Sequence, residues 1–590
     1  MDPAQAILLE EITKNSIVNE TILRGDSTVQ QFYENAVIFV SGGSGFLGKN
    51  LIEKLLRSCN VKKIYVLLRP KKQKTVEERL AQLVDDSVFE CLRTMKPNYA
   101  SKICVIPGDV GELSLGISSE DTRIVTEEVN VIFHAAATTN FMEHLKKAIL
   151  INTRGTQEML KLAKNCKKLK SFIYVSTAYS HATKKYKGKT MLEEFQPTPY
   201  KPELMIQLAE QFNEAALESM TPSLLREWPN TYSFTKAISE ELVRNMVGQF
   251  PIAVSRPAIV IGAYREPSPG WIDLSAIYGA SGMIMGIGVG ILHLMYSRQE
   301  ILLDWVPVDL VSNAIVASGQ RTAVRWSNGH KDIKIYTTTG YRNPQSLHQH
   351  TKIIRKQASK VTTDKAIWYN FLIHVESFPL FVLLFWLMHY IPAYLVDGML
   401  ILMRRRPVLR KLYAKAYRLN AAVSVYLHNE WKFDDSNLYE MYKELSPADQ
   451  IIYNSDMADL DWKRYIVIWC IGIRKYIVKD GINKTEYAVK KQKRYLNTLT
   501  GAHKLSWKCI TCVSKVPKKD NTNTPVRGPA CHMTVTRGAA APSPPSPREE
   551  ISVRDESLDE SRDVPFELTG FGVEKSFRVL VEEVRLSGKK

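Results

Sequence analysis

The stretch AVIFVSGGSGFLGKNLIEKLLR, residues 36–57, indicates the fold class. Residues 36–40 form a short, apolar, β-branched run that is typical of a buried strand, and residues 49–57 carry apolar side chains at helical spacing. A glycine-rich turn joins the two. The sequence therefore predicts a strand, a tight turn and a helix in direct succession.

The turn carries Gly42, Gly45 and Gly48 at Gly-x-x-Gly-x-x-Gly spacing. Glycine lets the backbone turn sharply and approach a pyrophosphate, which is bound at the positive N-terminal end of the following helix. We predict that a dinucleotide binds this turn, including Phe46 and Leu47. A flexible turn is the alternative, but the position between a strand and a helix favours the binding site.

Further apolar runs predict strands at 64–68, 103–106, 131–133 and 172–175, and most are separated by helical stretches such as 77–83 and 156–163. Strands that alternate with helices are typical of α/β folds with a doubly wound parallel sheet of Rossmann type. We expect this domain over residues 35–350, with a substrate-binding portion from about residue 265. Residues 1–34 are expected to be an N-terminal extension.

Beyond residue 355 the strands give way to apolar and basic helical stretches, such as 410–419 and 437–445, which predict a helical C-terminal domain over residues 355–478. Its apolar segment, residues 378–403, exceeds the roughly 20 residues that span a membrane, and three arginines follow it. Two interpretations stay open. The segment is inserted in a membrane, or it is a buried helical hairpin bent at Pro392, with Asp397 inside it.

The composition of residues 500–590 predicts a disordered tail. Residues 542–547 are rich in Pro and Ser, and residues 549–563 carry many charges. Cys509 and Cys512, with Cys531 further on, have a metal-like spacing. A single Cys-x-x-Cys in a polar tail is a weak signal, so no metal site is expected.

The composition narrows the class of partner. The formal net charge of +18 favours anionic ligands and anionic membrane surfaces, with an ordinary solvated surface as the alternative. No zinc-finger or homeodomain pattern is present, so no nucleic acid is expected. The eight cysteines form no disulfide-like framework, which indicates a reducing, cytosol-facing protein. Charged residues near the N-terminus predict that there is no secretory signal.

The end of the second predicted strand indicates which dinucleotide is used. A protein that prefers NAD usually places an acidic residue there, whereas this chain has Arg69 followed by Pro70, Lys71 and Lys72. Cations suit a 2′-phosphate, so we predict NADPH, with a solvated basic turn as the alternative. Asp109, after the third strand, is placed to accept a hydrogen bond from the adenine amine, or is simply a surface aspartate.

Tyr232 and Lys236 form a Tyr-x-x-x-Lys pair, which a helix would present on one face, one turn apart. A phenol titrates near 10, and a neighbouring ammonium lowers that pKa, so we expect Tyr232 to be a proton donor with a lowered pKa. Thr177 follows the fifth predicted strand and adds a hydroxyl that could orient a substrate carbonyl. Tyr232, Lys236 and Thr177 are the candidate catalytic residues.

With these features in place, the sequence resembles the extended short-chain dehydrogenase/reductases. The further motifs are 133–137 (FHAAA), 152–156 (NTRGT), 256–257 (RP) and 305–309 (WVPVD). More narrowly, residues 27–480 resemble the fatty acyl-CoA reductases of animals. The motifs that carry this are 45–48 (GFLG), 67–72 (LLRPKK), 269–273 (PGWID), 429–434 (NEWKFD) and 472–476 (GIRKY).

The resemblance implies NADPH-dependent reduction of long-chain fatty acyl-CoA to the primary alcohol and CoA through an aldehyde-level intermediate. It also implies that Pro257 and Lys236 contact the cofactor. Membrane lipid is the implied second partner, with the catalytic domain facing the cytosol at the endoplasmic reticulum or peroxisome.

Two regions depart from the family pattern. The chain becomes polar after Lys515, where such reductases commonly carry a second apolar segment, and residues 274–292 near the expected acyl site are unusually rich in Gly and Met. A hydroxysteroid dehydrogenase or sugar-nucleotide epimerase would share the glycine turn and the Tyr/Lys pair but typically lacks the helical domain. A non-catalytic NADPH-binding membrane scaffold is a third possibility, against which Thr177, Tyr232 and Lys236 argue. The sequence predicts neither oligomeric state nor acyl chain length.

Overall fold

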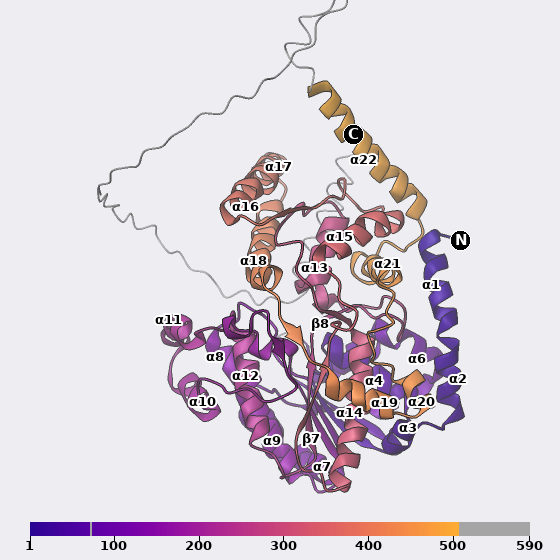
Figure 1. The fold of residues 1–590 in the computed structure, drawn as a ribbon, viewed down its shortest axis with the longest axis vertical. Helices are drawn as coiled ribbons and strands as arrows, with labels where there is room; N and C mark the ends of the chain where they lie inside the picture. Colours follow the sequence, from indigo (N-terminus) through magenta and orange to yellow (C-terminus); the bar gives the residue numbers. More distant parts are fainter. Residues whose placement is uncertain (71–73, 507–590) are drawn as a thin grey trace, which may run out of the picture.

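The computed structural model describes residues 1–70 and 74–506 (Figure 1). Lys71, Lys72, the Cys509, Cys512 and Cys531 pattern, and the predicted tail from residue 507 lie outside the described residues.

A seven-stranded sheet with every pair parallel forms the centre of the molecule. Its order is β11 (Lys334–Thr338), β7 (Ile252–Pro257), β5 (Ser171–Val175), β4 (Val131–His134), β1 (Val37–Ser41), β2 (Lys63–Leu68) and β3 (Ile103–Pro107). The chain runs outward from β1 to β3 and then returns to place β4 on the other side of β1. This confirms the predicted doubly wound sheet and puts its switch point between β1 and β4.

Both faces of the sheet are covered, which is why its strands are mainly apolar. Along β1, Val37 and Phe39 belong to one core and Ile38 and Val40 to the other. Helices α4 (Phe46–Ser58) and α14 (Val308–Ser327) cover one face, and α7 (Ser119–Glu128), α9 (Gly155–Asn165) and α12 (Thr231–Arg244) cover the other (Figure 1).

Strands β7 and β11 were not among the strands expected from the sequence. Arg256 interrupts the apolar pattern of β7, yet its side chain is only 3% exposed, because it pairs with the Glu240 carboxylate at 2.6 Å. This ion pair lets β7, the second strand from one edge of the sheet, carry a buried charged residue.

The C-terminal part is mostly helical, as predicted. It contains α18 (Leu409–His428), α19 (Ser436–Glu444), α21 (Trp462–Gly472) and α22 (Thr485–Ser506). Helix α22 runs past residue 500, where the predicted tail begins.

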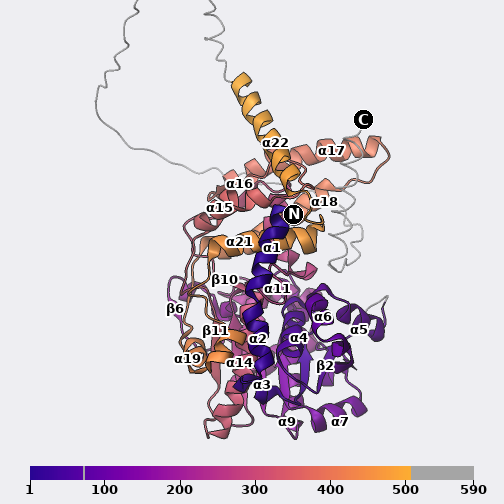
Figure 2. The ribbon, with the colours of Figure 1, turned by 90° about the vertical axis from the view of Figure 1, so that its right-hand side faces the viewer.

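The N-terminal extension is helical as well. Helix α1 (Pro3–Lys14) lies beside α21 and α22 (Figure 2). The Asp2 carboxylate accepts hydrogen bonds from the Thr485 amide at 2.8 Å and hydroxyl at 2.7 Å, and Glu11 pairs with Arg464 at 2.7 Å. These contacts tie the start of the chain to its C-terminal helices.

The apolar segment forms one helix, because α16 (Phe378–Phe385) continues through a π-turn (Trp386–Tyr390) into α17 (Ile391–Leu402). Pro392 directly follows the π-helical turn inside this continuous helix, and no hairpin forms there. Asp397 is buried and accepts hydrogen bonds from the backbone amides of Val408, Leu409 and Arg410 at 2.9–3.0 Å. It therefore caps the following helix, α18.

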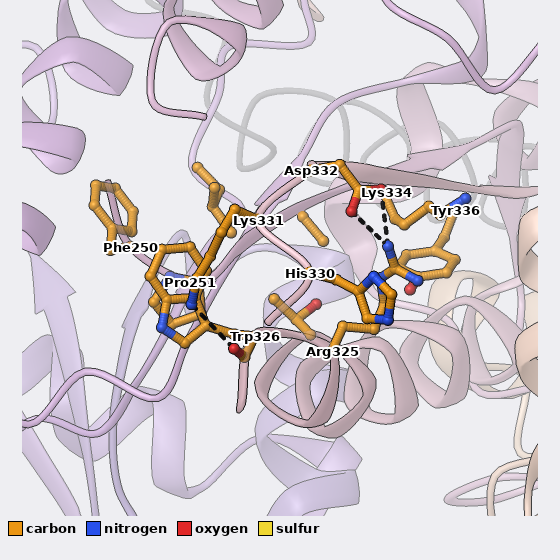
Figure 3. Close-up of a pocket in the computed structure, with 12 residues that line it drawn as sticks. Phe250, Pro251, Arg325, Trp326, His330, Lys331, Asp332, Lys334 and Tyr336 are labelled. Atoms are coloured by element: carbon orange, nitrogen blue, oxygen red, sulfur yellow. Dashed lines mark hydrogen bonds and ion pairs between the residues drawn. The ribbon is translucent and has the colours of Figure 1, made fainter. Parts of the chain in front are cut away.

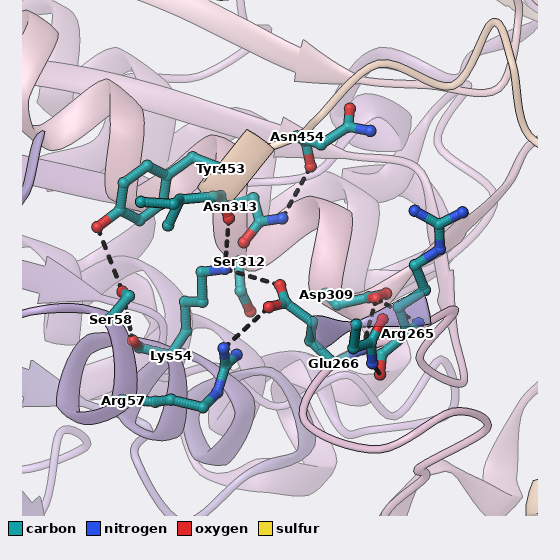
Figure 4. A network of polar contacts seen from close by, with 12 residues as sticks. Lys54, Arg57, Ser58, Arg265, Glu266, Asp309, Ser312, Asn313, Tyr453 and Asn454 are labelled. Carbon is teal, nitrogen blue, oxygen red and sulfur yellow. Dashed lines mark hydrogen bonds and ion pairs between the residues drawn. The ribbon is translucent and has the colours of Figure 1, made fainter. Parts of the chain in front are cut away.

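A buried polar network joins α4, the helix that follows the glycine turn, to the rest of the molecule (Figure 4). The Glu266 carboxylate binds Lys54 at 2.7 Å and Arg57 at 2.9 Å, and this pairing holds the pKa of Glu266 at about 2 although burial alone would raise it. Lys54 also donates to the Ile452 carbonyl at 2.5 Å. Since an unpaired buried charge is costly, the network fixes α4 against the C-terminal part.

Candidate active site

The candidate residues gather along one edge of the sheet. The glycine turn follows β1, Arg69 follows β2, Asp109 follows β3, Thr177 follows β5, and Pro257 ends β7. The carboxyl ends of parallel strands meet at the same edge, which is where ligands bind in open α/β sheets.

The glycine turn is shaped for close approach. Gly42 has a φ of +76°, and a Cβ there would lie 2.7 Å from the Ala135 backbone. A Cβ on Gly48 would collide with the Gly42 carbonyl oxygen, whereas one on Gly45 would meet only that oxygen, at 3.3 Å. The backbone is therefore closely packed around Gly42 and Gly48, whereas there is space beside Gly45.

Phe46 and Leu47 open helix α4, and both are half-buried. The first amides of a helix have no partner within it, so those of Phe46, Leu47 and Gly48 form the positive end that an anion needs. The Phe46 ring packs on Trp271, with centroids 5.5 Å apart. The cradle fits a pyrophosphate.

Arg69 and Asp109 lie together, with an ion pair of 3.2 Å in which the Arg69 side chain is half exposed. Sequence reasoning missed a second arginine beside them. Arg79, on α5 (Val76–Val84), donates to the Arg69 carbonyl oxygen and, at 3.2 Å, to the Ser44 hydroxyl in the glycine turn. Two guanidinium groups therefore stand beside the turn, an arrangement suited to a phosphate.

Tyr232 lies in the first turn of α12, whose N-cap is Asn230. The Thr177 hydroxyl donates to the Pro257 carbonyl oxygen at 3.4 Å, and it also interacts with the Tyr232 phenol. Burial raises the pKa of Tyr232 well above 10, and the hydrogen bond with Thr177 only partly opposes this. The two hydroxyls thus converge.

The expected lowering of the pKa of Tyr232 by Lys236 is wrong, because that pKa is raised. The Lys236 ammonium donates to the Val175 carbonyl oxygen at 2.8 Å and lies 4.8 Å from the centre of the Tyr174 ring. Burial lowers the pKa of Lys236 to about 7, against the pull of Glu240. Near pH 7 Lys236 is charged only about half of the time, and it faces a carbonyl oxygen. It therefore cannot offset the rise that burial causes in the pKa of Tyr232.

A buried ion pair supports this helix from behind. Glu240, one turn beyond Lys236, pairs with Arg256 at 2.6 Å and accepts a hydrogen bond from the Ser176 hydroxyl at 2.5 Å. The pair joins α12 to β7 and to the residue just before Thr177. It therefore fixes the three candidate catalytic residues relative to one another.

The C-terminal part supplies residues that sequence reasoning did not assign to the site. The Tyr426 hydroxyl, near the end of α18, accepts a hydrogen bond from the Asn230 side-chain amide at 2.8 Å and lies 3.0 Å from the Ser233 hydroxyl. Its ring packs on Phe141 and Tyr179, with centroids 5.5 and 5.2 Å apart. The Phe141 ring lies 6.0 Å from that of Tyr232.

This aromatic wall continues through Trp431 and Phe433, whose rings lie 6.2 and 4.9 Å from Tyr179. Both belong to the 429–434 motif, which was the available signal, but spacing alone cannot reveal contacts across about 250 residues. The helical domain thus builds one wall of the site.

A small hollow elsewhere does not belong to this site. It lies at the amino ends of β7 and β11, where Arg325 pairs with Asp332 at 2.7 Å beside Trp326 and Tyr336 (Figure 3). Its volume of about 10 Å³ admits at most one water molecule. Among residues 1–70 and 74–506, no group of three His, Cys, Asp or Glu side chains could hold a metal ion.

Comparison with known proteins agrees with this arrangement. Two family models, both described as male sterility protein, match residues 40–315 and 388–480, and the first is an NAD-binding model. The reductase domain of a nonribosomal peptide synthetase from Mycobacterium tuberculosis shares the fold, with a TM-score of 0.50 at 19% identity over 80% of this chain and 98% of that domain. The chain thus carries a nicotinamide-dinucleotide-binding fold.

Two relatives are closer in sequence. Fatty acyl-CoA reductase wat of Drosophila melanogaster is 34% identical over 80% of this chain and 90% of its own length. Fatty acyl-CoA reductase 2 of Mus musculus is 33% identical over 81% of this chain and 91% of its own length. On these similarities and this fold, the chain belongs to the fatty acyl-CoA reductase family of oxidoreductases.

Proposed function

We propose that this protein reduces long-chain fatty acyl-CoA to the primary alcohol with NADPH, through an aldehyde-level intermediate. The observation that carries the proposal is the convergence of the Thr177 and Tyr232 hydroxyls at the carboxyl edge of the sheet, beneath an apolar aromatic wall. Two hydroxyls can hold one carbonyl oxygen, and an apolar wall suits an acyl chain. The names of the relatives favour this reaction over sugar-nucleotide epimerisation or hydroxysteroid oxidation.

In this proposal the cofactor lies across the carboxyl edge of the sheet. The turn from Gly42 to Gly48 holds the pyrophosphate on the amides of Phe46, Leu47 and Gly48, and Gly45 leaves room for it. Arg69 and Arg79 hold the 2′-phosphate, and Asp109 lies at the adenine end.

The nicotinamide end is assigned to Pro257 and Lys236, beside Thr177 and Tyr232. NADPH supplies a hydride to the carbonyl carbon of the substrate. Thr177 and Tyr232 donate hydrogen bonds to its oxygen and stabilise the charge that develops there.

Tyr232 and Lys236 then handle the proton transfer that completes the reaction. When the thioester has been reduced, the carbon–sulfur bond breaks, CoA leaves as the thiolate, and an aldehyde remains between the same two hydroxyls. A second hydride converts it to the alkoxide, and Tyr232 donates the proton that completes the alcohol. The high pKa of the buried phenol keeps it protonated until that step, and the Lys236 ammonium would stabilise the phenolate that results.

We also propose membrane association, with the catalytic part on the cytosolic face of the endoplasmic reticulum or the peroxisome. Support comes from the helix Phe378–Leu402, which is long and apolar enough to enter a bilayer and has only 22% of an apolar 18-residue stretch buried in the structure. Long-chain acyl-CoA and fatty alcohol both partition into membranes, so a membrane position suits the reaction.

The test is to incubate the purified full chain with NADPH or NADH and acyl-CoAs of different chain lengths, and to resolve alcohols and aldehydes by mass. We expect alcohol with NADPH from long-chain substrates. Tyr232→Phe keeps the ring but removes the proton donor, so alcohol formation should fall about 10²- to 10⁴-fold while NADPH still binds. Near-normal turnover by that variant would overturn the assignment of Tyr232.

A further inference from the structure

The helix Phe378–Leu402 has one buried side and one bare side. Its buried residues recur every fourth position at Phe381, Phe385, His389, Ala393 and Asp397. This spacing places them on one narrow stripe. Within residues 1–70 and 74–506, the other side chains of the helix are half-buried or exposed.

Large apolar side chains cover the bare side, and each is between 45% and 84% exposed. They are Phe378, Leu380, Leu383, Trp386, Leu387, Ile391, Tyr394, Leu395, Met399, Ile401 and Leu402. A continuous apolar surface of this kind marks a site of interaction with a protein or a membrane.

The buried stripe is attached to α18 along most of its length. At one end Asp397 caps α18 through the amides of residues 408–410. Further along, His389 packs on Tyr413 and Phe381 on Tyr417, with ring centroids 5.0 and 5.9 Å apart. The two helices therefore form an antiparallel pair, which lies at the end of the molecule away from α7 and α9 (Figures 1 and 2).

The exposed face of α18 is basic. Arg410, Lys411, Lys415 and Arg418 are its exposed long side chains, and Arg404 and Arg406 are exposed in the connection between the two helices. Acidic side chains are absent from α18 itself. The apolar helix Phe378–Leu402 and the basic face of α18 thus lie side by side.

We propose that this helix pair docks in the plane of an anionic membrane, within one leaflet. This inference rests on the proposed membrane association and specifies its geometry. The bare apolar side of Phe378–Leu402 enters the acyl chains, while Arg404, Arg406 and the four cations of α18 lie among the lipid phosphates. Charge complementarity selects an anionic bilayer rather than a protein groove.

A helix that crosses the bilayer does not fit the observed contacts. Because α18 is attached to the stripe from Asp397 to Phe381, a crossing helix would carry the four cations into hydrocarbon. Detaching α18 would instead leave Asp397 uncapped and unpaired in the apolar layer. An in-plane position keeps both the contacts and the hydration of the cations.

The geometry also relates the membrane to the site. Helix α18 begins at the docking surface and carries Tyr426 to the aromatic wall. At about 1.5 Å per residue, Tyr426 lies roughly 24 Å along the helix from Arg410. One rigid element therefore positions the candidate active site relative to the leaflet.

Topology is tested in sealed microsomes from cells that make the full chain. Two variants are made, Ser377→Cys before the helix and Arg406→Cys after it, and a membrane-impermeant maleimide is added with and without detergent. Labelling is corrected for the parental protein's own cysteines. In-plane docking predicts that both positions are labelled equally without detergent. Protection of one of them until detergent is added would mean that the helix spans, and would overturn the inference while leaving membrane association intact.

Lipid selectivity is tested with purified full chain and vesicles of phosphatidylcholine, with or without phosphatidylserine. At about 1 kcal/mol per cation, Lys411→Gln with Lys415→Gln should weaken binding to anionic vesicles roughly 25-fold. The matched control, Lys164→Gln with Lys168→Gln on the far end of the molecule, removes the same charge and should bind like the parent. Equal binding to neutral and anionic vesicles would refute the headgroup contact. A full chain that binds neither vesicle and leaves the microsomes in the soluble fraction would refute the proposed membrane association itself.

Discussion

Removal of the Tyr426 hydroxyl probes how the helical domain supports the site. Tyr426→Phe keeps the ring against Phe141 and Tyr179 but deprives the Asn230 side-chain amide of its acceptor at 2.8 Å. Asn230 is only 6% exposed, so no bulk water replaces the lost partner. The same side chain accepts the Ser233 amide at 2.9 Å and so caps the helix turn that carries Tyr232.

The expected size follows from these contacts. A buried donor left without a partner costs about 1–3 kcal/mol, and each roughly 1.4 kcal/mol corresponds to a tenfold change in rate. If this free energy destabilises the conformation in which Tyr232 is placed for catalysis, kcat decreases by a factor between about 5 and about 150. NADPH affinity should be unchanged, because the glycine turn does not contact Tyr426.

A double-mutant cycle separates this positioning role from a general loss of stability. In an Asn230→Ala background the amide is absent, so adding Tyr426→Phe should cost at most about 0.5 kcal/mol more in kcat. Tyr417→Phe, two and a half turns earlier on α18, is the matched control and should leave kcat unchanged. The reasoning fails if the two substitutions are additive, or if Tyr426→Phe turns over within twofold of the parent.

Two further predictions concern the cofactor. Arg69→Ala and Arg79→Ala should each weaken NADPH binding by about 1.5–3 kcal/mol and leave NADH binding nearly unchanged, by fluorescence titration; equal losses for both cofactors would mean that these arginines are structural. Because burial lowers the pKa of Lys236 to about 7, the ammonium is lost as pH rises through that value, so kcat/KM for NADPH should fall above pH 7. A profile flat to pH 9 would exclude a role for the charged lysine in the free enzyme.

The same lysine makes stability depend on pH in a defined direction. Its folded pKa of about 7 lies below the ordinary value of 10.5, so the buried charge destabilises the fold fully below pH 7. Between these values only the unfolded chain keeps the proton, and this contribution to the free energy of unfolding therefore rises with pH. Lys236→Met should remove the rise measured by urea unfolding over that range; an unchanged slope would show that Lys236 does not cause it.

The centre of the fold could be predicted from sequence because its signals are local. Strands β1 to β5 are short apolar runs, and the glycine turn joins a strand to a helix within a few residues. Strand β7 was not predicted, because the charged Arg256 interrupts its apolar pattern. In the folded protein Glu240, on α12, pairs with that charge. A pairing between distant residues leaves no periodic trace in either segment.

The candidate site shows the same division. Thr177, Tyr232 and Lys236 follow from spacing, but Arg79 and Tyr426 enter the site only through contacts made by the folded chain. The prediction of a lowered pKa for Tyr232 was wrong for a related reason. Spacing places a lysine one turn away, whereas burial and the Val175 carbonyl decide the charge on that lysine and its direction.

In the proposed reaction, one site delivers two hydrides to a fatty acyl thioester. The most direct measurement uses the purified full chain, a long-chain acyl-CoA and NADPH that carries deuterium at both C4 positions, with mass analysis of the product. We expect a primary alcohol with two deuterium atoms at C1, two NADPH consumed and one CoA released per molecule. An alcohol with one deuterium or none, or no alcohol at all, would contradict it.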